Sequence, residues 1–146
     1  MNLFTIGFTG KNARRFFELL QQAGVKRLID IRLNNRSQLA GFTKQDDLAF
    51  FLEAIAGIEY LYLPELAPSK SLLNDYKSQK LDWESYQKVY RKLLDERRVS
   101  HHFQAQLFDQ SCLLCSEHLP DQCHRRLAAE YLNQQWQFPF SLQHLR

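Results

Sequence analysis

The chain alternates between short apolar runs and longer segments in which apolar residues recur every three or four positions. The apolar runs have the length and the β-branched or aromatic content of β-strands, and they end at glycine, proline or charged residues. They cover residues 3–8, 27–32, 58–63 and 111–116. Residues 138–145 at the end of the chain are expected to add one further strand. The pattern therefore predicts four or five strands.

Helical periodicity fills most of the intervals between these strands. The first helix is expected to begin at Asn12, which caps it, and to end at Gly24. A second helix ends at Gly57, and a third runs over residues 83–98. The last helix follows Asp121, which we expect to be its N-cap. Each helix presents one apolar stripe, as expected for a helix that packs on a sheet.

Two other segments have a weaker pattern. Residues 65–82 predict a loop or lid, and residues 101–110 are expected to form a second helical piece. No repeat, low-complexity tract or linker interrupts the chain, so residues 1–146 are predicted to form one domain. Strands that alternate with helices predict a Rossmann-like α/β fold of three layers, in which helices cover both faces of a mostly parallel sheet.

Composition and charge narrow the class of protein. Of the 146 residues, 45% are hydrophobic and 24% are charged, values typical of a soluble globular protein. The net charge of +3 is too small to indicate nucleic-acid binding by itself. We see no apolar run of about 18 residues and no signal peptide, so no membrane association is expected. Three cysteines without an export signal predict reduced thiols and a cytoplasmic location.

Polar side chains follow most of the predicted strands at the point where each strand ends. In a parallel sheet these ends meet at the carboxyl edge, where ligands of open α/β sheets bind. We therefore expect the following residues to converge on one functional site: Thr9, Asp30, Arg32, Glu65, Cys115 and Glu117.

The cysteines have different predicted surroundings. Cys112 and Cys115 are three residues apart on a strand and point to opposite faces, so Cys112 is predicted to be a core thiol. Cys115 ends that strand. Cys123 falls in the first turn of the last helix if Asp121 is the N-cap. The partial positive charge of a helix N-terminus, together with Arg125, favours a thiolate and an anionic ligand there.

Other interpretations of this segment remain. Cys123, His124 and Arg125 are also compatible with plain packing, the arginine pairing with a nearby carboxylate. A zinc site is not predicted, because adjacent ligands and a gap of seven residues match no common zinc module. A phosphatase loop requires arginine after five intervening residues, where this chain has Asp121.

Several motifs occur in an order that resembles a known family. They are TIGFTG near the N-terminus, DIR with the later Ser37 and GF, Tyr60 with LPEL, and LLCSE followed by CHRR. Together they resemble the bacterial and archaeal family called domain of unknown function 488, over nearly the whole chain. The resemblance implies an α/β fold and no established reaction. The matching positions are Gly7, Asp30, Arg32, Ser37, Phe42, Tyr60, Cys115, Glu117, Cys123, His124 and Arg125.

The leading hypothesis is a domain that binds a small anion or nucleotide at the carboxyl edge, as a binding protein or as an enzyme. The predicted catalytic residues are Cys115 or Cys123 as nucleophile, His124 as general acid or base, and Glu117 or Asp30 as the orienting carboxylate. The predicted substrate-binding residues are Asp30, Arg32, Ser37, Tyr60 and Arg125. Two alternatives are a nucleic-acid-binding module without turnover and a purely structural polar network. The sequence does not identify a cofactor, so the cofactor is unknown.

Overall fold

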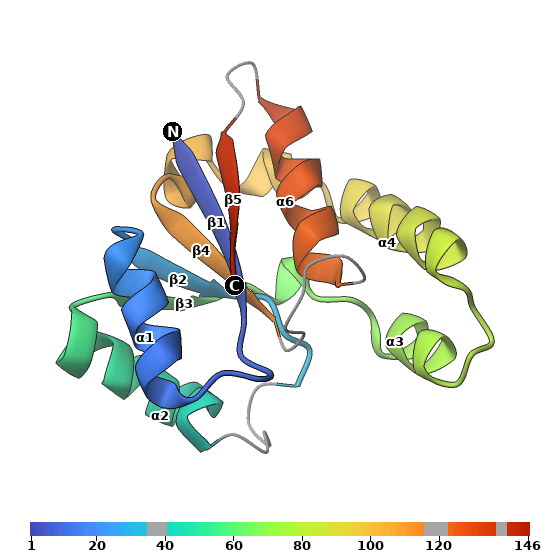
Figure 1. The fold of residues 1–146 in the computed structure, drawn as a ribbon. Coiled ribbons are helices and arrows are strands. Elements are labelled where there is room, and N and C mark those ends of the chain that lie inside the picture. Colours follow the sequence, from blue (N-terminus) through green and yellow to red (C-terminus); the bar gives the residue numbers. More distant parts are fainter. Residues whose placement is uncertain (35–40, 116–122, 137–139) are drawn as a thin grey trace.

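A computed structural model of the chain describes residues 1–34, 41–115, 123–136 and 140–146. Within these residues the strands form one parallel sheet in the spatial order β3-β2-β4-β1-β5 (Figure 1). The bounds of the strands are β1 Asn2–Gly7, β2 Arg27–Asp30, β3 Glu59–Tyr62, β4 Ser111–Cys115 and β5 Ser141–Leu145. The four predicted strands and the fifth at the end of the chain are confirmed.

Strand β4 lies at the centre of the sheet, and all of its residues are buried. Its apolar sequence suits this position, because a strand covered on both faces needs no polar side. The register places Cys115 opposite Gly7 of β1 and Leu114 opposite Asp30 of β2. The carboxyl ends of these three strands therefore lie side by side.

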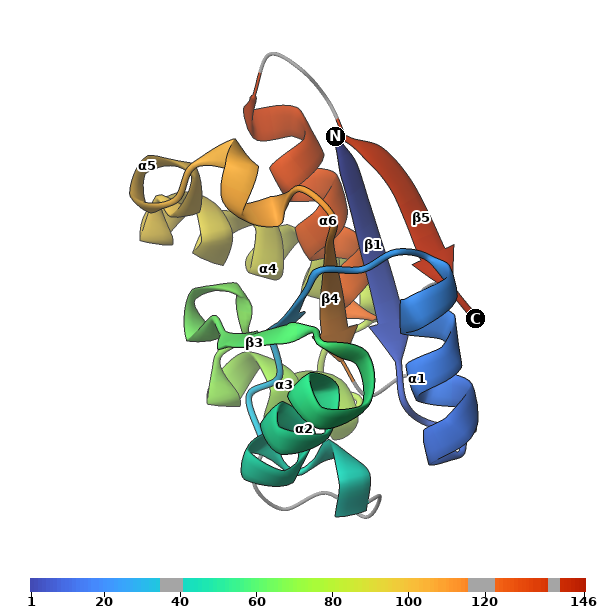
Figure 2. The same cartoon turned by 90° about the vertical axis from the view of Figure 1, so that its left-hand side faces the viewer.

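Helices cover both faces of the sheet, which confirms the predicted three-layer α/β fold. Helix α1 (Ala13–Gln22) and helix α2 (Gln45–Phe51), which continues into a π-helical turn at Leu52–Ala56, pack on one face (Figure 2). Helix α4 (Trp83–Arg97) and helix α6 (His124–Gln135) pack on the other (Figure 1). In the part of the chain that the structure describes, no helix combines the length and apolarity needed to cross a membrane.

Local chemistry explains how several helices begin and end. The Asn12 side chain accepts a hydrogen bond from the backbone N–H of Arg15 and so caps α1, as predicted. Gly24 and Gly57 adopt left-handed backbone conformations after their helices, with φ of 74° and 63°. At α6 the N-cap is Cys123. The prediction that Cys123 lies in the first helical turn is therefore wrong, and Asp121 lies outside the described residues.

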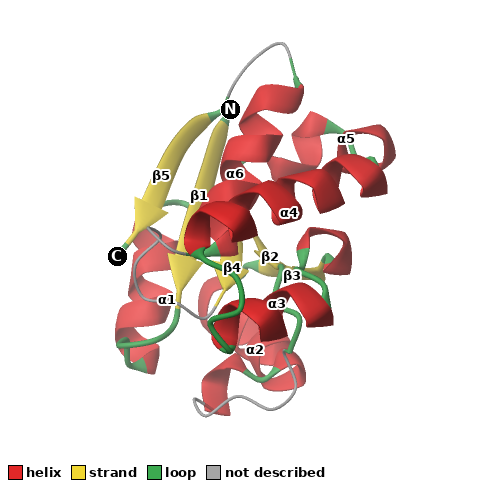
Figure 3. Ribbon diagram, turned by 90° about the vertical axis from the view of Figure 1, so that its right-hand side faces the viewer, coloured by secondary structure: helices red, strands yellow, loops and turns green. Residues whose placement is uncertain are grey.

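The segment predicted as a loop or lid contains a helix, so that prediction is wrong in part. Helix α3 (Lys70–Lys77) is capped by Ser69 and lies beside α4 (Figure 3). The apolar stripe of α3 is too short to predict a helix from sequence. The helix is stabilised by Leu72 and Tyr76, which pack into the core beside α4. The predicted helical piece after α4 is shorter than expected: α5 spans Val99–His102, and a 3₁₀ turn spans Ala105–Phe108. Further 3₁₀ turns cover Gly41–Thr43 and Pro64–Leu66.

Candidate functional site

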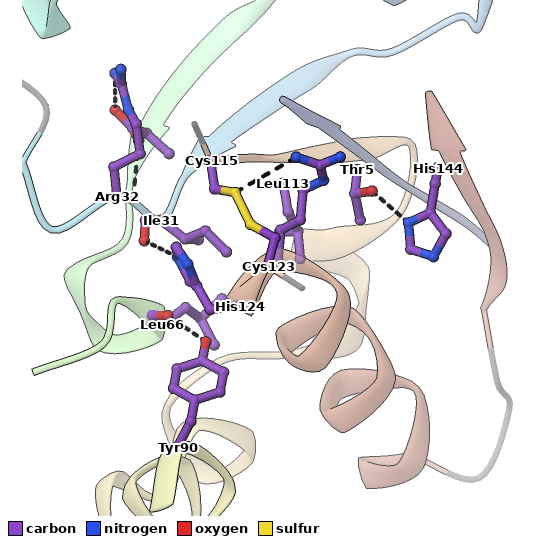
Figure 4. The surroundings of a disulfide bond; sticks show 12 residues. Thr5, Ile31, Arg32, Leu66, Tyr90, Leu113, Cys115, Cys123, His124 and His144 are labelled. Carbon is purple, nitrogen blue, oxygen red and sulfur yellow. Dashed lines mark hydrogen bonds and ion pairs between the residues drawn. A yellow bond between two sulfur atoms is a disulfide. The ribbon is translucent and has the colours of Figure 1, made fainter. Parts of the chain in front are cut away.

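The carboxyl edge of the sheet gathers most of the predicted site residues. Asp30 ends β2, Arg32 follows it, and Cys115 ends β4. Cys123, the N-cap of α6, lies beside Cys115 (Figure 4). His124 and Arg125 form the start of the same helix. Thr9 and Glu65 are exposed. Ser37 and Glu117 lie outside the described residues, so the geometry addresses neither of them.

The strand geometry separates the cysteines as predicted. Cys112 is a free, fully buried thiol in the core on the α1 and α2 face, and burial raises its pKa well above the ordinary value. Cys115 points to the other face, toward α6. It forms a disulfide with Cys123, and the two Cα atoms are 7.6 Å apart. The pairing differs from the expectation of three reduced thiols. Both residues of the pair are almost fully buried, at 1% and 3% exposure.

A buried guanidinium lies against this sulfur pair. Arg125 is fully buried, and its Nη1 donates to Cys115 Sγ at 3.6 Å. Lys11, in the loop between β1 and α1, is also buried. Its burial and the nearby charges of Arg125 and Arg15 lower its pKa to about 8. Arg125 therefore places a buried positive charge against Cys115.

His124 has a defined tautomer. Its Nε2 lies 2.8 Å from the carbonyl oxygen of Ile31 (Figure 4). A carbonyl oxygen only accepts hydrogen bonds, so Nε2 carries the proton and Nδ1 keeps its lone pair. Burial lowers the pKa of His124 to about 4, and the ring packs edge-on against Tyr90. The imidazole is therefore neutral at pH 7 and suited to act as a base or a ligand.

Asp30 and Arg32 form a buried ion pair. Arg32 Nε donates to Asp30 Oδ1 and Nη2 donates to Oδ2, each at 2.8 Å, and both side chains are buried. The hydroxyl of Tyr60 on β3 donates to the same Oδ2 at 2.7 Å. The guanidinium also lies over the ring of Phe8, 5.7 Å from its centroid. Asp30 and Arg32 therefore form a buried ion pair, and their role in substrate binding stays a prediction.

The hydrophobic and polar pattern of the sequence did not identify several residues that neighbour the site. Tyr60 was identified by the family resemblance alone, although the register places it diagonally opposite Asp30 on the adjacent strand. Nothing in the sequence identified Lys11 or Tyr90 as a neighbour of the site, because Lys11 lies in a loop and Tyr90 on the apolar side of a helix. A further polar pair joins Thr5 of β1 and His144 of β5, whose Oγ1 and Nδ1 atoms are 2.6 Å apart.

One arrangement was not anticipated from residue spacing. The ligand atoms of Cys115, Cys123 and His124 all lie within 4.8 Å of one another. The sequence patterns placed these residues in one candidate site, but a gap of seven residues followed by two adjacent ligands did not indicate this metal-ligand geometry. The strand end and the helix start create it, because β4 and α6 pack against each other.

Comparison with known proteins identifies a family and no individual relative. Neither the curated proteins nor the solved structures contain a match to this chain. A family model matches residues 12–132, a span that includes the ion pair after β2, the end of β4 and the start of α6. The chain therefore belongs to the family described as Domain of unknown function DUF488.

Proposed function

We propose that this domain is an enzyme that acts on an anionic substrate through a thiolate at Cys115. The observation that carries the proposal is the buried Arg125 guanidinium, which donates a hydrogen bond to Cys115 Sγ. A hydrogen bond and a positive charge both favour the charged form of a thiol, while burial alone opposes it. Burial raises the pKa of Cys112 in the core of the same strand, and the charges of Arg125 and Lys11 offset only part of that increase.

The other residues have roles that follow from their contacts. His124, neutral with Nδ1 available to accept, serves as the general base. The positive charges of Lys11 and Arg125 and the N-terminus of α6 attract the anionic group of the substrate. The Cys115–Cys123 disulfide is the resting form. A dithiol reductant converts it to two thiols and is itself oxidised to a disulfide, as the predicted cytoplasmic location would allow.

The pH dependence of alkylation of the reduced protein tests the thiolate. In a Cys112→Ala, Cys123→Ser background, Cys115 is the remaining cysteine, so iodoacetamide reports on it alone. Burial slows alkylation at every pH alike, so the readout is the midpoint of the profile. We expect a midpoint below the ordinary thiol value of about 8.5, and Arg125→Gln should raise it by more than one pH unit. A midpoint at or above 8.5 that Arg125→Gln leaves unchanged would refute the proposal.

Anion binding is tested separately by thermal unfolding. At constant ionic strength, phosphate and nucleoside phosphates should raise the melting temperature more than chloride does. Lys11→Gln should reduce this shift. Lys26→Gln is the matched control, because Lys26 is an exposed lysine at the amino end of β2, opposite the carboxyl edge. Equal shifts in chloride and phosphate would contradict the anion-binding role.

A further inference from the structure

We propose that reduced Cys115 and Cys123 form, together with His124, a three-ligand site for a thiophilic divalent cation such as Zn²⁺. The side-chain ligand atoms of these residues lie within 4.8 Å of one another (Figure 4). Sulfur and imidazole nitrogen are the donors that zinc prefers, whereas Mg²⁺ and Ca²⁺ select oxygen. The proposal goes beyond the proposed function: Cys115 Sγ and His124 Nδ1 are ligands in the metal-bound form, which is distinct from the metal-free form in which they act as nucleophile and base.

The backbone spacing of the two cysteines suits a shared ion. Their Cα atoms are 7.6 Å apart, whereas most disulfides join Cα atoms about 4.4–6.8 Å apart. Two thiolates bound to one tetrahedral zinc at about 2.3 Å hold their sulfurs about 3.8 Å apart. A metal between the sulfurs therefore accommodates a wider backbone separation than a direct bond between them.

The surrounding hydrogen bonds already orient the ligands. A metal-binding histidine usually donates its second ring N–H to a carbonyl or carboxylate, which fixes the tautomer. The Nε2–H of His124 donates in this way to Ile31, and Nδ1 is left as the metal ligand. Arg125 Nη1 donates to Cys115 Sγ, a contact that also stabilises a metal-bound thiolate.

Charge and coordination number define what this site would do. Two thiolates and a neutral imidazole balance a divalent cation, so the ion adds no net charge beside Arg125. Three protein ligands leave a fourth tetrahedral position for water or substrate, as in catalytic zinc sites. The disulfide and the metal exclude each other. Two electrons and two protons from a dithiol convert the disulfide to two thiols, and the cation displaces the thiol protons when it binds.

Cobalt binding tests the site, because Co²⁺ takes the place of zinc and reports its ligands spectroscopically. The chain is reduced, freed of reductant under anaerobic conditions and titrated with Co²⁺. We expect one equivalent to bind, with a thiolate-to-cobalt charge-transfer band and the intense visible bands of tetrahedral cobalt. Zn²⁺ should abolish these bands by displacement. The oxidised protein should show no such bands.

Variants identify the ligands. Cys115→Ser and Cys123→Ser should each weaken Co²⁺ binding at least 100-fold, and His124→Ala at least 10-fold. Cys112→Ala is the matched control, since this cysteine lies on the opposite face of the sheet and should leave the spectrum unchanged. Circular dichroism of each variant checks that it is folded.

Two results would overturn the proposal: no charge-transfer band in the reduced, folded protein, or a band that persists in Cys123→Ser. Neither depends on the alkylation midpoint of Cys115. An ordinary pKa of the Cys115 thiol with tight cobalt binding would reject the proposed function and keep the metal site. A lowered pKa of that thiol without cobalt binding would keep the proposed function and reject the metal site.

Discussion

Two largely buried polar clusters at the carboxyl edge of the sheet differ in the hydrogen-bond partners of their polar groups. In the β2 cluster, formed by Asp30, Arg32 and Tyr60, a carboxylate accepts hydrogen bonds from a guanidinium and a hydroxyl. In the β4 cluster, formed by Cys115, Cys123, His124 and Arg125, the guanidinium donates to a sulfur atom and the imidazole donates to a backbone carbonyl.

The difference shows which cluster is suited to chemistry. The main consequence of a buried ion pair is for the fold, because removal of one partner leaves the other charge buried without compensation. Thiols and an imidazole change their protonation, oxidation or metal ligation under ordinary conditions. We therefore propose that the reactive groups belong to the β4 cluster and that the β2 cluster has a structural role beside it.

The largest expected effect comes from breaking the β2 ion pair. Asp30→Asn leaves the buried Arg32 guanidinium without its counter-charge, and removal of one partner of a buried pair costs about 3–5 kcal/mol. Urea unfolding of the variant measures this cost. The double variant Asp30→Leu, Arg32→Met should recover most of it, because it removes both charges. A loss below 1 kcal/mol in Asp30→Asn would show that the pair is not the structural element of this edge.

The next effect is a pH dependence of stability that originates in the β4 cluster. The pKa of His124 is lowered by burial to about 4 in the folded protein, against an ordinary value of 6.5. Between these values the unfolded chain binds a proton that the folded chain does not, so stability is complete above about pH 6.5 and falls as the pH decreases toward 4. From pH 7 to pH 4.5 we expect a loss of about 2–3 kcal/mol from this residue.

The control for this pH effect is His124→Gln, which keeps an N–H donor for the Ile31 carbonyl and does not titrate. Carboxylates also titrate in this range, so the readout is the difference between the wild-type and variant unfolding free energies at each pH. The difference should change by about 2–3 kcal/mol across the range. Parallel curves would show that His124 does not carry the effect.

The smallest effect concerns the third member of the β2 cluster. Tyr60→Phe removes the hydroxyl that donates to Asp30, and we expect a loss of about 1–2 kcal/mol because the acceptor is charged. Repeating the substitution in the Asp30→Leu, Arg32→Met background should make it nearly neutral. An equal loss in both backgrounds would assign the effect to packing and would remove Tyr60 from the cluster.

Local sequence patterns predicted much of the scaffold. The strands follow from short apolar runs, and the caps at Asn12, Gly24 and Gly57 follow from side-chain and backbone preferences. The placement of Cys112 in the core and Cys115 on the other face follows from the two-residue period of a strand. These features depend on neighbours in the chain, so the chain alone indicates them.

Features that depend on distant neighbours were predicted poorly. The apolar stripe of helix α3 is short, and the helix could be recognised only from its packing beside α4. The N-cap of α6 is Cys123, whereas the sequence pattern predicted Asp121. The hydroxyl of Tyr60 and the ammonium of Lys11 reach the site from segments with no motif of their own beyond the family resemblance.

The sequence by itself determined an α/β fold, polar residues at the carboxyl edge of the sheet and a candidate site in the cysteine segment. These features depend on hydrophobic periodicity and strand alternation, which are local properties of the chain. The tertiary structure decided which side chains meet. The order β3-β2-β4-β1-β5 inserts β4 between β1 and β2, and α6 returns over it, so Cys115, Cys123, His124 and Arg125 come together. That order depends on how whole elements pack, and no spacing between residues encodes it.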